Sequence, residues 1–177
     1  EYLCGESLYA RIERTGSLQT GELIRLGIEL CRIMNYLHSF KPNPILYLNL
    51  HPGNLLICRE QLKLIDFDQA ALASLSQERS VCYGTKGFAA PEQYEGGTLD
   101  ERTDIYAIGA LLYYMGTGHA PEGEIKAGQG SCRGDLYILM GRCLRTEKKE
   151  RCQSVREVLE ALEKLEARIF AERHIPL

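Results

Sequence analysis

Three polar side chains near the middle of the chain are of types that could act together in chemistry. The stretch YLNLHPGNLLI, residues 47–57, contains Asn49 and then Asn54, which opens an apolar run. A second apolar run, LKLI, leads directly into Asp66. Amide and carboxylate oxygens both accept hydrogen bonds, but only a carboxylate can also take up a proton. Taken singly, these residues are ordinary for turns and solvated loops, so the case for a site depends on their surroundings.

Three more motifs follow in order along the chain. GTKGFAAPEQY, residues 84–94, contains the run Ala-Pro-Glu that ends at Glu92. DERTDIYAIGALLYYMGTG is apolar almost all round between Thr103 and Met115, which predicts a helix buried on every side. TEKKERCQS then carries Arg151 between charged and polar neighbours.

The elements that must position these motifs are predicted to be mainly helices. Thr20 is a plausible N-cap for a helix with apolar residues on one face, and this helix should stop near Phe40 because Pro42 follows. Two apolar runs joined by a tight polar turn, residues 59–61, predict a β-hairpin. The other helices are predicted at residues 6–14, 103–115, 134–144 and 154–170.

Composition limits the class of protein without choosing a function. The chain has 177 residues, 45% of them apolar and 25% charged, which is ordinary globular usage. A formal net charge of −3 gives no reason to expect a nucleic-acid partner. The seven scattered cysteines include no C-x-x-C pair and indicate reduced thiols in a cytoplasmic protein. No apolar run approaches the ~18 residues that a membrane span requires.

The motifs and their order resemble the large C-terminal lobe (C-lobe) of a protein kinase of the serine/threonine type, with wording close to bacterial receptor-like kinases. The resemblance covers residues 1–170 and leaves 171–177 as a tail. It implies a mainly α fold with a small β-hairpin near the catalytic loop, and with the β-rich N-terminal lobe absent. Within the C-lobe it assigns a hinge remnant at 1–8, a catalytic-like loop at 47–54 and an activation segment at 66–92.

The resemblance also implies roles for individual residues. Asn54 and Asp66 match the two Mg²⁺ ligands of the family, while Asn49 stands at the position of the catalytic Asp. His51 stands where the family has a lysine that steadies the transferring phosphate. The residues that match the nucleotide pocket are Glu1, Leu3 and Leu56. Kinases use ATP and Mg²⁺, but we expect weak or absent binding here, because the chain contains no G-x-G-x-x-G loop and no Val-Ala-Ile-Lys strand.

Three contacts inside the lobe are implied as well. Glu92 and Arg151 are expected to form a buried ion pair that anchors the activation segment. Asp104 is expected to accept hydrogen bonds from the loop around residues 47–49. Phe67 is expected to fill the core.

Two functions remain open from the sequence. The first is a pseudokinase module, because Asn49 cannot act as a general base, a role worth roughly 10²–10⁴-fold in rate. The second is the C-lobe of an active serine/threonine kinase whose small lobe lies upstream, since the first residue is Glu1 and not Met. In either case we expect a protein partner or substrate, which the sequence does not identify.

Overall fold

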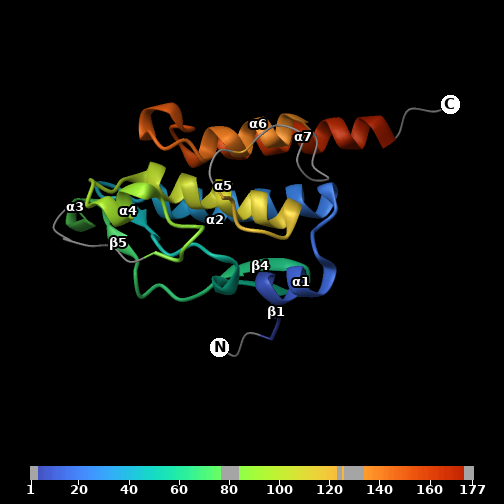
Figure 1. The fold of residues 1–177 in the computed structure, drawn as a ribbon, viewed down its shortest axis with the longest axis horizontal. Coiled ribbons are helices and arrows are strands. Elements are labelled where there is room, and N and C mark those ends of the chain that lie inside the picture. The colour runs from blue at the N-terminus through green and yellow to red at the C-terminus, as the bar shows by residue number, and fades with distance from the viewer. Residues whose placement is uncertain (1–3, 77–83, 123–124, 126–133, 174–177) are drawn as a thin grey trace.

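The computed structural model describes residues 4–76, 84–122, 125 and 134–173. Helices dominate it and form layers (Figure 1). Two long helices, α2 and α5, lie at the centre; α6 and α7 cover one side of them, and α1 lies with short strands on the other. The helices are α1 (Leu8–Thr15), α2 (Thr20–His38), α3 (Ala73–Ser76), α4 (Pro91–Glu95), α5 (Glu101–Thr117), α6 (Gly134–Cys143) and α7 (Val155–Arg173).

The predicted helices are confirmed, with small shifts at their ends. Helix α2 begins at Thr20 itself, and Gln19 is the N-cap, so the N-cap prediction was wrong by one residue. The same helix ends at His38 instead of near Phe40. Within the described ranges, no helix is both long and apolar enough to cross a membrane.

Helix α5 is the most enclosed element, as its apolar sequence predicts. Its side chains from residues 103 to 115 are buried, apart from two tyrosines that are half-buried. Gly109 permits close packing on α6, because a Cβ at this position would lie 2.5 Å from the Cβ of Cys143. The helix starts at Asp100, whose side chain accepts a hydrogen bond from the Arg102 amide, and it ends at Gly118 in the left-handed region at φ 80°.

The predicted hairpin is also confirmed, with a tighter turn. Strands β3 (Leu55–Cys58) and β4 (Gln61–Leu64) pair antiparallel, and Cys58 lies opposite Gln61. The turn is therefore the two residues Arg59 and Glu60, with φ values of 48° and 66°, which suit the right-handed twist of the strands. The remaining short elements are β1 (Glu6–Ser7), β2 (Ile45–Leu46), β5 (Ala71–Leu72) and the 3₁₀ helices η1 (Pro52–Asn54) and η2 (Lys148–Glu150).

A buried arginine ties three parts of the fold together. Arg151 Nη1 and Nη2 donate to the two carboxylate oxygens of Glu92 at 2.7 and 2.8 Å, so the predicted ion pair is confirmed. The remaining guanidinium N–H groups donate to the carbonyl oxygens of Arg102, Arg145 and Thr146. The Arg151 side chain has 0% exposure, so each of its five N–H groups needs a protein acceptor, and each has one.

Replacing Arg151 by alanine should lower the free energy of unfolding by roughly 3–5 kcal/mol, because the carboxylate of Glu92 is then left buried without its partner. Urea unfolding of both proteins measures this loss. Arg156→Ala is the matched control, since Arg156 pairs with Glu160 on the surface with 77% of its side chain exposed. The control should cost less than about 1 kcal/mol. Equal unfolding midpoints for the parent and Arg151→Ala would contradict the prediction.

Candidate active site

The loop that carries Asn49 is held by hydrogen bonds to a buried carboxylate on α5. Asp104 Oδ2 accepts the backbone N–H of Tyr47 at 2.9 Å, and its Oδ1 accepts that of Leu48 at 2.8 Å. The contact expected of Asp104 is therefore confirmed. His38 Nε2, at the end of α2, lies 2.8 Å from Oδ2 of the same carboxylate. These bonds hold Leu48 in the left-handed region at φ 65°, which a leucine rarely adopts without such support.

Tyr47 joins this loop to the segment that begins at Asp66. Its hydroxyl lies within hydrogen-bonding distance of the carbonyl oxygens of Ile65 and Asp66, the latter at 3.0 Å. Burial raises the pKa of Tyr47; a hydrogen bond with Asn54 opposes this rise and the charge of Asp66 adds to it. The side chain of Asn54 and the backbone carbonyl of Asp66 therefore both lie near the same hydroxyl.

Asn49 faces the later part of the predicted activation segment. Its Oδ1 accepts the hydroxyl proton of Thr85 at 3.2 Å, and its backbone carbonyl accepts Nδ2 of Asn54 at 3.1 Å. Both bonds use acceptors that an aspartate at this position would also offer. The loop can keep its shape with Asn49, yet the uncharged amide provides no group that takes up a proton.

Asn54 and Asp66, the predicted metal ligands, differ in their exposure. Asn54 is only 6% exposed. Its backbone carbonyl accepts a hydrogen bond from the backbone N–H of Ile65 at 3.0 Å. Asp66 is exposed at φ 61°, and one of its carboxylate oxygens accepts the Asp68 amide at 3.3 Å. An amide and a carboxylate oxygen are hard donors suited to Mg²⁺. Among the described residues, no three His, Cys, Asp or Glu side chains converge as they would in a preformed metal centre.

His51 has a local structural partner that a lysine at this position could not provide. Its Nδ1 accepts the Gly53 N–H at 3.2 Å and caps the 3₁₀ helix η1. Burial lowers the pKa of His51, and the negative charge of Asp66 partly offsets this effect. The imidazole is therefore neutral at pH 7, where a lysine would be charged. Its neutral tautomer carries the remaining proton on Nε2, which can donate a single hydrogen bond.

The structure describes one of the three residues predicted to line the nucleotide pocket. Leu56 is half-buried on β3, on the face opposite the buried side chains of Leu55 and Ile57. Glu1 and Leu3 lie outside the residues that the structure describes. The role of all three in nucleotide binding stays a prediction.

Phe67 corrects one expectation. It is 47% exposed and does not fill the core. The fully buried ring of Tyr47 occupies the space beneath it, and Phe67 packs edge-on against that ring with 5.3 Å between the centroids. The tyrosine therefore takes the interior position, and the phenylalanine covers it.

Gln93 is a positioning residue that the sequence analysis missed. Its side chain is 2% exposed; Nε2 donates to the Leu48 carbonyl at 2.8 Å and Oε1 accepts the Ala90 amide at 3.0 Å. One side chain thus links the first turn of α4 to the loop of Asn49. The only signal in the sequence is its place directly after Glu92.

Comparison with known protein families shows to which family this chain belongs. A model of the protein kinase domain matches residues 1–172, which is nearly the whole chain. The chain belongs to the protein kinase family. The assignment of residues 47–54 to a catalytic-like loop and of residues 66–92 to an activation segment stays a prediction.

Individual kinases are similar over part of their length. Serine/threonine-protein kinase A of Synechocystis sp. is 28% identical over 97% of this chain and 38% of its own length. Serine/threonine-protein kinase PknB of Mycobacterium leprae is 31% identical over 68% of this chain and 20% of its own length. Integrin-linked protein kinase 1 of Arabidopsis thaliana is 32% identical over 67% of this chain and 26% of its own length. The chain thus spans well under half of the length of these kinases.

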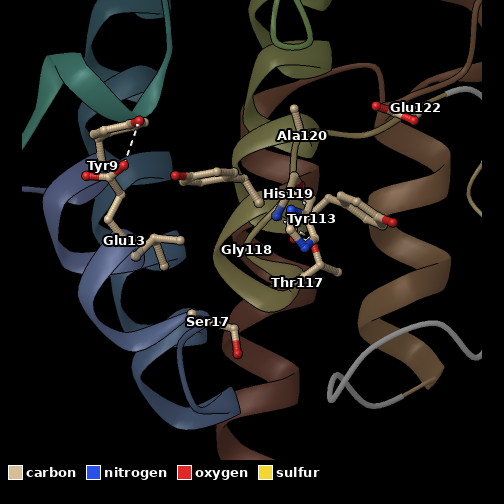
Figure 2. A pocket seen from close by; sticks show the side chains of 12 residues that line it. Tyr9, Glu13, Ser17, Tyr113, Thr117, Gly118, His119, Ala120 and Glu122 are labelled. Carbon is tan, nitrogen blue, oxygen red and sulfur yellow. Dashed lines mark hydrogen bonds between the residues drawn. The ribbon is translucent and has the colours of Figure 1, made fainter.

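A large open cavity is lined by other parts of the chain than residues 47–54 (Figure 2). It has a volume of about 1030 Å³ and lies between α1 and the last turn of α5, with Tyr9 and Glu13 on one side and Tyr113 and His119 on the other. Its described lining includes none of the predicted catalytic or metal-binding residues. Size alone therefore does not identify the kinase site in this chain.

Replacing Asp104 by asparagine should lower the free energy of unfolding by about 1–3 kcal/mol, because the amide NH₂ then faces backbone N–H donors that lose their acceptor. Amide hydrogen exchange at Tyr47 and Leu48 should become faster at the same time. Asp135→Asn is the matched control, since Asp135 forms an exposed ion pair with Arg168 and should change stability by about 0.5 kcal/mol or less. Unchanged exchange at both loop amides would refute the anchoring role of Asp104.

Proposed function

We propose that this chain is a pseudokinase-like C-lobe that binds a protein partner and transfers phosphate poorly or not at all. The observation that carries the proposal is the environment of Asn49. Its amide oxygen already accepts a hydrogen bond from the Thr85 hydroxyl. The amide is uncharged and does not take up a proton at neutral pH. Losing a general base costs about 3–5 kcal/mol of barrier lowering, which is roughly 10²–10⁴-fold in rate.

Neighbouring side chains support this proposal. His51 bonds to the Gly53 amide and has a lowered pKa caused by burial, so it presents no positive charge to a transferring phosphate at pH 7. The scaffold contacts of Arg151 and Asp104 are kept in full. A lobe with an intact scaffold and a neutral catalytic loop suits a binding role better than a catalytic one. We include a cytoplasmic location in the proposal, because the described cysteines are free thiols.

A second candidate is the C-lobe of an active serine/threonine kinase with reduced activity, whose small lobe lies upstream. The observation that favours it is that Asn54 and Asp66 both lie near the Tyr47 hydroxyl. We propose that these two side chains would hold the Mg²⁺ of a bound ATP, which would supply neutralisation of phosphate charge. Asn54 and Asp66 are the two donors predicted for this site, so phosphate and water oxygens would complete the coordination and affinity would be weak.

Phosphate transfer separates the two candidates. With the chain joined to the small lobe of an active kinase, Asn49 should give activity near background, and Asn49→Asp should raise the rate of transfer to a protein substrate by about 10²–10⁴-fold. Adding Asp66→Ala to that variant should remove the gain, because the metal ligand is lost. Full activity with Asn49 intact would overturn the pseudokinase proposal. No gain from Asn49→Asp would mean that His51, Tyr47 or Asp68 also blocks transfer.

Ligand binding is tested independently of catalysis. Mg²⁺ and ATP together, at a concentration near the dissociation constant, should raise the melting temperature of the joined protein by about 1–2 °C. Asp66→Ala should abolish the shift, and Asp135→Ala should keep it, because Asp135 lies on the surface of α6. A shift that survives Asp66→Ala unchanged would remove Asp66 from the proposed metal site.

A further inference from the structure

Two cysteines lie in contact next to Arg151 and its hydrogen-bond partners. Cys143 is the last residue of α6, and Cys152 precedes the first turn of α7. Their Sγ atoms are 3.9 Å apart, and both side chains have 0% exposure. Cys31 on α2 is also fully buried and belongs to the same hydrophobic core cluster.

The two thiols in contact are chemically unequal. The S–H of Cys143 donates to Sγ of Cys152, and this hydrogen bond lowers the pKa of Cys152 and raises the pKa of Cys143. The positive charge of Arg142 also favours the thiolate of Cys152. Burial, in contrast, raises the pKa of Cys31. Cys152 is therefore the better nucleophile, because the thiolate is the reactive form of cysteine.

The pair brackets the segment that holds Arg151. The carbonyl oxygens of Arg145 and Thr146 accept two of the guanidinium N–H groups, and both residues lie between Cys143 and Cys152. Cys152 follows Arg151 directly in the chain. A covalent link between the two cysteines would close residues 143–152 into a loop and hold the acceptors of Arg151 in place.

We propose that Cys143 and Cys152 form a reversible intramolecular disulfide on exposure to a peroxide, and that this bond staples the segment that anchors Arg151. The inference holds for a catalytic or a non-catalytic lobe, because neither cysteine belongs to the candidate active site.

The chemistry balances with hydrogen peroxide as the oxidant. The Cys152 thiolate attacks one peroxide oxygen, the O–O bond breaks, and Cys152 sulfenic acid and hydroxide form. The Cys143 thiol then attacks the sulfenic sulfur; the new S–S bond forms, and the sulfenic hydroxyl leaves as water with the thiol proton. Each disulfide thus consumes one peroxide and two thiols and yields two waters. A dithiol reductant reverses the change.

Burial sets the rate of this reaction. Because both side chains have no exposed surface, the oxidant reaches them only when the segment between α6 and α7 opens locally. Forming the bond requires the two sulfurs to approach from 3.9 Å to the ~2.05 Å of a disulfide. The exposed Cys4 should react with peroxide faster than the pair does.

The test treats the full chain with hydrogen peroxide and follows it by intact mass and by peptide mapping after alkylation. Apart from the oxygen atoms that Cys4 gains, the expected product has lost about 2 Da, two hydrogen atoms, with the cross-link mapped to Cys143 and Cys152. The cross-linked protein should melt roughly 5 °C higher than the reduced protein and return to the reduced value with dithiothreitol.

Matched variants identify the pair. Cys31→Ala removes a buried thiol from the same core and should leave the cross-link intact, whereas Cys143→Ala should abolish it. Mapping in the unsubstituted protein decides the question even where a variant fails to fold. A cross-link from Cys152 to Cys31, or two unmodified thiols at residues 143 and 152 after Cys4 is fully oxidised, would overturn the proposal.

Discussion

The fully buried guanidinium of Arg151 is the interaction on which the rest of the lobe depends. A charge without solvent is costly unless every donor finds an acceptor, and this side chain finds five. The acceptors come from α4, from the first turn of α5 and from the segment after α6. The Thr103 hydroxyl donates a further hydrogen bond to Oε1 of Glu92, which also accepts from Nη1 of Arg151. Because the planar fork of an arginine fits only one arrangement of these groups, it fixes the position of Glu92 relative to α5 and to the segment after α6.

A second buried side chain, Asp104, holds the loop of residues 47–54 in place. Asp104 lies on the same helix as Arg102 and Thr103, and it accepts the amides of Tyr47 and Leu48. Gln93 completes the link, since it joins the start of α4 to the Leu48 carbonyl. None of these bonds uses the side chain of Asn49. The scaffold can therefore keep its geometry with either aspartate or asparagine at residue 49.

The proposed disulfide would add a covalent link next to the same network. Cys143 packs on Gly109 of α5 as well as on Cys152, so a disulfide there would join the segment of Arg151 to the end of α6 where α6 packs on α5. Local opening of this segment is the motion that such a bond would suppress, and that motion also exposes the Arg151–Glu92 pair to water.

The sequence by itself determined the family, the five longer helices, the hairpin and the ion pair of Glu92 with Arg151, but not the short helices α3 and α4. Helical periodicity and turn residues are local signals, and the kinase motifs stand in a fixed order, so both can be recognised without coordinates. Only the tertiary structure decided that Tyr47 is buried while Phe67 is exposed, that His38 and Gln93 support the catalytic loop, and that Cys143 meets Cys152. These outcomes depend on which side chains from distant parts of the chain compete for the same space and the same acceptors. No local pattern encodes that competition, because packing and buried hydrogen bonds are settled only when all the elements are in place.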